Sequence, residues 1–132
     1  MLNDKHVVLL VDDDPITVGF LDHYFSRIEW ITRTANSVID ALPKLDPDVD
    51  LVITDYDMPH LNGCDMRQMV RQTYPNIRVL GMSGFNFSDR DMITRMFDAF
   101  LQKPFRVSDL RTKISQILLM EHPTLKIATA VV

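Results

Sequence analysis

The segment Asp50–Gly63, DLVITDYDMPHLNG, contains the pattern that decides the fold. An apolar, β-branched run from Leu51 to Thr54 ends on an acid, Asp55, and turn residues follow soon after. Such a run predicts a buried strand. Asp55 is then expected at the carboxyl end of that strand, where open α/β sheets place their chemistry. Because an unpaired buried charge is unfavourable, the pattern also predicts a metal ion or a cationic partner beside this carboxylate.

On both sides of this segment, short apolar runs alternate with amphipathic stretches. The expected strands are residues 7–11, 30–35, 50–55, 77–82 and 99–102. The expected helices are residues 15–28, 37–45, 64–73, 89–97 and 107–120. This alternation predicts an α/β fold with one domain, a doubly wound five-stranded parallel sheet that helices cover on both faces. The expected strand order is the flavodoxin-like 2-1-3-4-5.

Local signals mark where some of these helices begin. Asp14 is expected to cap the first helix, with Pro15 in its first turn. Asn36 is expected to cap the second helix, and Pro43 to make it short or bent. Apolar stripes predict which helix residues face inward. In the first and last helices these are Ile16, Phe20, Leu21, Tyr24, Leu110, Ile114, Ile117 and Leu118.

Length and composition narrow the class of protein. The chain has 132 residues, of which 46% are hydrophobic and 24% charged, as in globular proteins with a proper core. We expect a domain over residues 1–121 and a tail without periodicity over residues 122–132. The net charge of −4 argues against direct binding of nucleic acid, which needs clustered Lys and Arg.

The sequence also gives information on targeting, on disulfides and on zinc sites. The N-terminus lacks the pattern of a signal peptide, and no apolar run approaches the length of a membrane span. The single cysteine, Cys64, excludes an internal disulfide, and scattered histidines provide no zinc-site spacing. We therefore expect a cytoplasmic location.

Polar side chains follow four of the expected strands where those strands end. Asp12 and Asp13 follow the first, and Asp55 ends the third. Ser83 follows the fourth strand and Lys103 the fifth. In a parallel sheet these ends share one edge, and the first and third strands are neighbours at the switch point. The sequence therefore predicts that these groups converge.

The charges of this set indicate its chemistry. Three carboxylates and one ammonium leave about two negative charges, which a divalent cation would balance. Hard oxygen ligands suit Mg²⁺, which usually binds one or two carboxylates together with phosphate oxygens. A phosphoryl group would bridge the metal, Ser83 and Lys103, and a carboxylate beside the metal can act as nucleophile to form an aspartyl phosphate.

With these residues the chain resembles the receiver domains of two-component response regulators. The matching stretches are VVLLVDDDP at 7–15, DLVITDYDMPHLNG at 50–63, VLGMSG at 79–84 and FLQKPF at 100–105. The resemblance covers about residues 6–121, and the four motifs occur in order.

The resemblance implies a role for each matched residue. Asp55 is the expected phospho-acceptor, with Asp12 and Asp13 as metal-binding acids. The Asp57 position is expected to offer Mg²⁺ a backbone carbonyl. By the same resemblance Ser83 is the hydroxyl that moves toward the phosphoryl group, Lys103 is its ion-pair partner, and Phe100 is the aromatic switch.

The chain also departs from the family pattern. Met96-Phe97 stands in place of a glycine-alanine pair, which puts the end of the fourth helix in doubt. Ser83 stands where Thr is commoner. Asp57 is an acid where apolar residues are frequent, and its side chain could reach the water that attacks an aspartyl phosphate.

Several functions compete at this point. The first is a phosphoryl-accepting switch that is not an enzyme, apart from its own phosphorylation and dephosphorylation. The second is a phosphatase similar to the haloacid dehalogenases, which also use a strand-end Asp and Mg²⁺. That reading fails at Pro15-Ile16 and Met58-Pro59, where the phosphatase motif needs a small residue followed by Thr or Val. The third is a receiver-like binding module that is never phosphorylated, which the complete set of acids disfavours.

The resemblance further implies partners. The phosphoryl donor would be a sensor histidine kinase or a phosphotransfer protein. The output would pass to a downstream protein, or to a second copy of the chain, through the face of the fourth helix, fifth strand and fifth helix. The chain is either a stand-alone regulator or a receiver cut from a longer protein, such as a hybrid sensor kinase.

Overall fold

The computed structural model describes residues 5–88 and 90–119, which form the predicted five-stranded parallel sheet. The strand order is β2-β1-β3-β4-β5, as the sequence predicted. The strands are β1 (Val7–Val11), β2 (Ile31–Ala35), β3 (Leu51–Asp55), β4 (Arg78–Ser83) and β5 (Ala99–Gln102). The helices are α1 (Pro15–Arg27), α2 (Val38–Ala41), the 3₁₀ turn η1 (Leu42–Lys44), α3 (Gly63–Thr73), α4 (Met92–Arg95) and α5 (Val107–Leu119).

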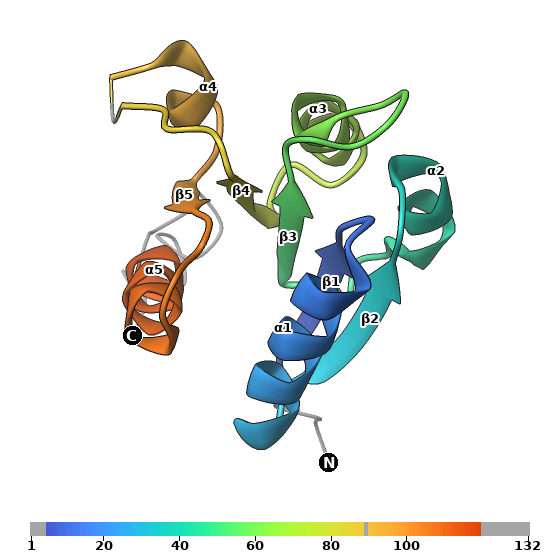
Figure 1. Cartoon of the computed structure of the whole chain (residues 1–132). Coiled ribbons are helices and arrows are strands. Elements are labelled where there is room, and N and C mark those ends of the chain that lie inside the picture. Colours follow the sequence, from blue (N-terminus) through green and yellow to red (C-terminus); the bar gives the residue numbers. More distant parts are fainter. Residues whose placement is uncertain (1–4, 89, 120–132) are drawn as a thin grey trace, which may run out of the picture.

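Helices cover both faces of the sheet, which makes three layers. Figure 1 shows α1 and α5 on one side and α2, α3 and α4 on the other. Strand residues alternate between the two cores. The first core joins the sheet to α1 and α5 and includes Leu10, Leu21, Phe25, Ile53, Leu80, Leu110 and Ile114. The second joins it to α2 and α3 and includes Leu9, Val38, Val52, Met66, Val70, Val79 and Phe97.

The register of the central strands positions the polar residues that follow them. β1 and β3 are buried along their whole length, as their apolar runs predicted. Val11 pairs with Thr54, and Asp55 pairs with Met82 on β4. The residues after β1 and at the end of β3 therefore reach the same edge of the sheet.

Some predicted core residues of α1 and α5 are exposed. In α1 the buried side chains are Leu21 and Phe25, whereas Ile16 is 81% exposed and Phe20 is 40% exposed. In α5 Leu118 is 48% exposed. The predicted stripes were too wide, because only a narrow part of each helix contacts the sheet.

The second helix also differs from its prediction. Its N-cap is Ser37, whose hydroxyl accepts from the amide of Asp40, so the expected cap at Asn36 was wrong. The predicted effect of Pro43 is confirmed, because α2 has only four residues and η1, which contains this proline, continues it. The cap of α1 was correct, since Asp14 accepts from the amide of Ile16.

The largest difference concerns α4. The sequence predicted a helix over residues 89–97, but α4 comprises only Met92–Arg95. The Asp91 carboxylate accepts from the amide of Ser88 and does not cap α4. Thr94 donates to the backbone oxygens of Ser88 and Asp91, and side chains that bond to nearby backbone compete with helix formation. After α4 the chain turns so that Phe97 enters the core.

Two predictions from the sequence cannot be compared with the structure. The expected tail at residues 122–132 lies outside the described residues, as does Met120, the expected end of the last helix. In the described part of the chain, no helix is long and apolar enough to cross a membrane.

Candidate functional site

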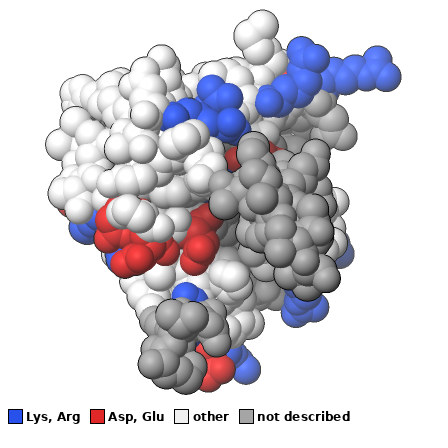
Figure 2. All heavy atoms as spheres, turned by 180° about the vertical axis from the view of Figure 1, so that it is seen from behind, with Lys and Arg blue, Asp and Glu red and all other residues white. Residues whose placement is uncertain are grey.

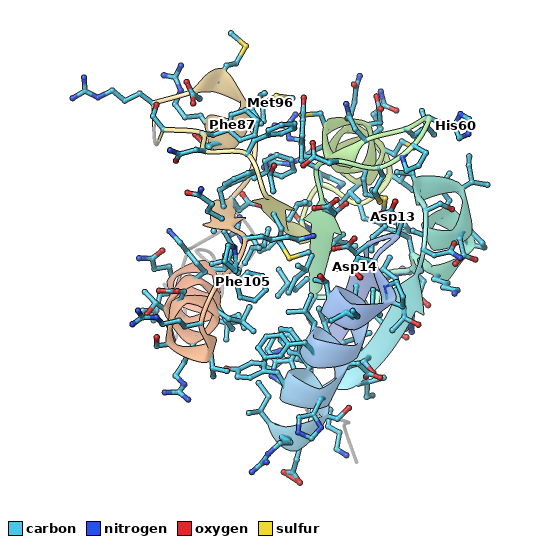
Figure 3. The ribbon with its side chains drawn as sticks, in the orientation of Figure 1. Asp13, Asp14, His60, Phe87, Met96 and Phe105 are labelled. Atoms are coloured by element: carbon cyan, nitrogen blue, oxygen red, sulfur yellow. The ribbon has the colours of Figure 1, made fainter. Side chains whose placement is uncertain are left out.

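Three acids meet at the carboxyl edge of the sheet. Asp12 follows β1 and Asp55 ends β3, and both are almost fully buried, whereas Asp13 is exposed. Each offers a carboxylate oxygen, and these oxygens all lie within 4.8 Å of one another. Figure 3 shows Asp13 and Asp14 where β1 passes into α1. Asp14 points its carboxylate at Ile16 and Thr17 of α1, in agreement with its predicted role as a helix cap.

Lys103 supplies the positive charge that the sequence predicted. Its ammonium donates to Asp12 Oδ2 at 2.7 Å and lies 3.0 Å from Asp55 Oδ1. The second contact lies off the direction of a hydrogen bond, so this buried Asp55 oxygen has no directed donor. One ammonium thus serves two buried carboxylates, while Asp13 adds a third negative charge.

Burial and these charges shift the acid–base equilibria of the site. Burial raises the pKa of Asp55 to about 6, and the nearby charge of Asp12 adds to this, while the close ammonium of Lys103 opposes it. Burial also raises the pKa of Asp12. For Lys103, burial lowers the pKa, but the hydrogen bond to Asp12 and the ion pair with Asp55 raise it by more, so the ammonium stays charged. The site therefore holds excess negative charge.

This donor set fits a divalent cation. All three side chains are hard oxygen donors at ligand spacing, and the buried Asp55 Oδ1 lacks a directed donor. Mg²⁺ prefers such oxygens and takes few protein ligands at once. Asp12, Asp13 and Asp55 are the residues that could hold it.

The loop after β3 is packed tightly against the end of that strand. The Tyr56 amide donates to the Met82 oxygen at 2.7 Å, and the Gly63 amide donates to the Tyr56 oxygen at 3.1 Å. A Cβ at Gly63 would lie 2.7 Å from the backbone oxygen of Asp55, so only glycine fits there. Asn62 then caps α3, with Asp65 completing a capping box. The sequence showed Asn62-Gly63 only as a turn, without its close approach to the backbone of Asp55.

Ser83 and Asp57 form a pair that the sequence did not predict. Ser83 is fully buried at the end of β4, and its hydroxyl donates to Asp57 Oδ2 at 2.8 Å. The same hydroxyl accepts from the amide of Phe85 at 2.9 Å. The departure of Asp57 from the family pattern was the only signal that could have pointed to this contact.

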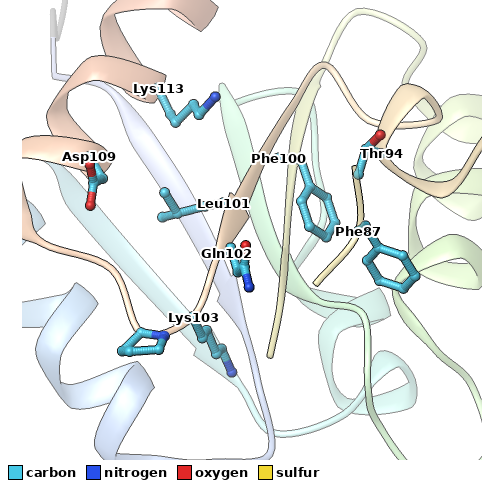
Figure 4. A pocket seen from close by; sticks show the side chains of 9 residues that line it. Phe87, Thr94, Phe100, Leu101, Gln102, Lys103, Asp109 and Lys113 are labelled. Atoms are coloured by element: carbon cyan, nitrogen blue, oxygen red, sulfur yellow. The ribbon is translucent and has the colours of Figure 1, made fainter. Parts of the chain in front are cut away.

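A chain of aromatic rings connects the acceptor loop to Phe100. Tyr56 contacts Phe87 edge-on at 5.7 Å, and Phe87 contacts Phe100 at 5.9 Å between ring centroids. Phe100 is half-buried and also contacts Phe97. Figure 4 shows Phe87 and Phe100 on the same side of β5 and Leu101 on the other. The sequence analysis named Phe100 as the expected switch residue but did not single out Phe87, which contacts it.

The sequence of the chain matches the family model of the response regulator receiver domain over residues 8–115, most of its length. The chain belongs to this family. The acids, the hydroxyl and the lysine therefore lie in the framework of a receiver domain, with the predicted strand order.

Curated relatives match this chain over only a small part of their own length. A putative transcriptional regulator from Haloferax volcanii is 31% identical over 114 residues, which cover 86% of this chain and 19% of the relative. The autoinducer 1 sensor kinase/phosphatase LuxN from Vibrio campbellii is 29% identical over 83% of this chain and 13% of the relative. The chain therefore spans about a fifth or less of the length of these relatives.

Solved structures show the same fold. The response regulator TrrA from Thermotoga maritima, solved with Mg²⁺ and BeF, superposes with a TM-score of 0.74 at 22% identity, over 85% of this chain and 98% of that chain. A complex of histidine kinase ThkA with TrrA contains a chain that matches with a TM-score of 0.75 at 24% identity, over 86% of this receiver and 98% of that chain.

Proposed function

We propose that this receiver accepts a phosphoryl group on Asp55 in a reaction that requires Mg²⁺, and that it signals by a change of conformation. The observation that carries the proposal is the position of Asp55: a buried strand-end carboxylate within ligand distance of Asp12 and Asp13 and in contact with Lys103. The match to the family and the TrrA structure with Mg²⁺ and BeF support it.

The residues of the site divide the chemistry among them. An Asp55 oxygen attacks the phosphorus, and the bond from phosphorus to the donor nitrogen or oxygen breaks with its electron pair leaving on the donor. Asp12 and Asp13 would hold Mg²⁺, with the Asp57 backbone carbonyl as a further ligand. Mg²⁺ bound there would supply positive charge against the charge of the transferring group. Lys103 already contacts Asp55 and is placed to bind a phosphoryl oxygen.

The donor is a phosphohistidine on a sensor kinase or phosphotransfer protein. TrrA has been solved with the histidine kinase ThkA, which supports a partner of this class. Next to Lys103 lies an apolar cavity of about 510 Å³, lined partly by Ile16, Phe20 and Phe105. The exposure of Ile16 and Phe20, unexpected for predicted core residues, gives such a donor an apolar surface beside the acid site.

The output surface is the face of α4, β5 and α5, which binds a downstream protein or a second copy of the chain. A groove of about 400 Å³ opens there, lined in part by Phe87, Thr94, Phe100 and Lys113 (Figure 4). Ser83 moves toward the phosphoryl group, and Phe100 changes its position in response. Figure 2 shows charges of both signs on one face of the molecule, with Lys and Arg near its upper edge and Asp and Glu below them. This mixture favours a protein partner over nucleic acid.

The lengths of the relatives are compatible with two contexts for this receiver, a stand-alone protein and a domain of a larger one. It acts alone, or it is the receiver of a larger protein such as a hybrid kinase, the arrangement that the size and name of LuxN favour. In both settings residues 1–121 are the proposed domain and the acceptor chemistry is the same.

Intact-mass measurement tests the acceptor. With Mg²⁺ and acetyl phosphate the chain should gain the mass of one phosphoryl group, and EDTA should prevent this. Asp55→Asn keeps the shape of the side chain and should abolish the gain. Asp14→Asn is the matched control, because Asp14 only caps α1 and should leave phosphorylation intact. A phosphorylated Asp55→Asn variant would contradict the assignment.

A further inference from the structure

The hydroxyl of Ser83 is already fully engaged in the unphosphorylated structure. Ser83 is buried, and its Oγ donates to Asp57 Oδ2 at 2.8 Å while it accepts from the amide of Phe85 at 2.9 Å. Its backbone oxygen accepts from the amide of Lys103 at 2.8 Å. A serine hydroxyl has a single proton to donate. That proton is committed to the Asp57 carboxylate.

The partner of this hydroxyl makes the bond stronger than an ordinary one. Asp57 is exposed and accepts as a carboxylate, and hydrogen bonds to an ionised acceptor are roughly twice as strong as neutral ones. The backbone before Asp57 is fixed, because the Tyr56 amide donates to the Met82 oxygen at the end of β4. Asp57 therefore reaches Ser83 from a loop that is already attached to the same strand, and joins the loop after β3 to the loop after β4.

We propose that the Asp57 carboxylate acts as a latch on Ser83. By accepting the hydrogen bond of the Ser83 hydroxyl, it holds the donor that would otherwise bond to a phosphoryl group on Asp55. This rests on the proposed function of Asp55 and adds a side-chain role to the backbone role of Asp57. Asp57 is a positioning residue: it acts on the phosphoryl group through Ser83. The latch stabilises the form in which Ser83 is bonded to Asp57. It therefore sets how much binding energy a phosphoryl group must supply to draw Ser83 away.

Phosphorylation opens the latch by exchange of a hydrogen bond. A phosphoryl group adds about two negative charges beside Asp57 and brings three strong acceptor oxygens. The Ser83 hydroxyl leaves Asp57 Oδ2 and donates to one of these oxygens, and water takes its place on the exposed Asp57 carboxylate. No covalent bond changes in this step. Because the latch opens only when a better acceptor is present, its strength lowers the apparent affinity for that acceptor.

Two other effects of Asp57 are separable from the latch. Its charge alone would repel any anion at Asp55, whether or not Ser83 carries a hydroxyl. Its backbone carbonyl, the proposed metal ligand, is kept in every substitution of the side chain. A double-mutant cycle with Ser83 distinguishes these effects, because only the latch requires the Ser83 hydroxyl.

The experiment is a titration with beryllofluoride, a phosphoryl mimic, at saturating Mg²⁺, followed by ¹⁹F NMR on the whole chain. Asp57→Ala should bind the mimic about fivefold more tightly than the wild type, the gain expected from removal of one competing hydrogen bond. Asp57→Asn, which keeps an acceptor but loses the charge, should fall between them. Asp48→Ala removes an exposed charge elsewhere and should have no effect. In the Ser83→Ala background the gain from Asp57→Ala should be clearly smaller, because only the repulsion by the Asp57 charge is left to remove.

Each outcome decides a different point. A gain of the same size with and without the Ser83 hydroxyl would mean that Asp57 acts by charge alone, and would overturn the latch. An unchanged or weaker affinity in Asp57→Ala, with the wild type binding normally, would also overturn it. If the wild type and all variants fail to bind the mimic, the proposed function itself is wrong. A second readout needs no anion: in Asp57→Ala the amides of Gly84 and Phe85 should exchange with solvent faster than in the wild type.

Discussion

At the scale of single residues, the proposed chemistry depends on a carboxylate that the fold buries beside a second acid. Asp55 is 4% exposed, and its neighbours include a second buried acid, Asp12, with only Lys103 to offset both. Strand-end acids could be predicted because the apolar run before each one is visible in the sequence. The bond between Asp57 and Ser83 could not, because it joins the loop after β3 to the end of β4, and only the folded chain determines their separation.

The raised pKa of Asp55 predicts how stability depends on pH. Burial raises this pKa to about 6 in the folded state, whereas an unfolded aspartate titrates at about 3.9. The folded state thus holds the proton more tightly, so the free energy of unfolding falls as the pH rises from about 4 to about 6. In EDTA, Asp55→Asn should therefore be more stable than the wild type at pH 7, by about 1–3 kcal/mol, with a much smaller difference at pH 4.

Urea denaturation at a series of pH values measures this difference. Asp48→Asn, at an exposed position, provides the control and should follow the wild type throughout. A difference between Asp55→Asn and the wild type that is independent of pH would show that the buried carboxylate is not its cause.

At the scale of elements, strands were predicted better than helices. The five strands coincide with the short runs that the sequence marked as strands, and the observed bounds differ from the predicted ones by at most one residue at each end. Helix α4 was predicted at more than twice its observed length because Thr94 and Asp91 direct their side chains to nearby backbone, which a periodic pattern does not reveal. The exposure of Ile16 likewise depends on how α1 sits against the sheet.

Two glycines in helices should respond oppositely to alanine. Gly19 lies in α1 with nothing within 4 Å of an added Cβ, so Gly19→Ala should raise the free energy of unfolding by about 0.5–1 kcal/mol. At Gly63, the first residue of α3, an added Cβ would lie 2.7 Å from the Asp55 oxygen and 2.9 Å from the Tyr56 Cα. Both are backbone atoms, so Gly63→Ala should lower that free energy by about 1–3 kcal/mol.

Chemical denaturation of both variants in one buffer gives the comparison, with Gly19→Ala as the matched control for helix propensity. A stabilised Gly63→Ala protein would contradict the close approach of α3 to the acceptor strand. The same variant should also bind beryllofluoride more weakly, because relief of the clash displaces the backbone of Asp55.

At the scale of the whole molecule, folding brings like charges together and a cation should relieve the repulsion. A ligand that binds only the folded state stabilises it by RT ln(1 + [L]/Kd), about 1.4 kcal/mol at ten times Kd. Millimolar Mg²⁺ should thus raise the melting temperature by several degrees. Asp13→Asn should lose most of that rise, because Asp13 is the exposed acid of the cluster.

Thermal unfolding with and without Mg²⁺ tests this. Asp14→Asn is the control: asparagine keeps the side-chain oxygen that caps α1, so the variant should melt close to the wild type and keep its full response to Mg²⁺. If Asp13→Asn responds to Mg²⁺ as fully as the wild type, the ion binds away from this cluster.

The position of β1 between β2 and β3 has a consequence for the chain during translation. The last of these three strands ends at residue 55. During synthesis Asp12, Asp13 and Asp55 therefore emerge from the ribosome well before Lys103. A nascent chain that pairs its first three strands gathers the carboxylates while their counter-charge has not yet been synthesised. We therefore expect the amino-terminal half to complete its sheet late, or to use cellular Mg²⁺ as a temporary substitute for the lysine.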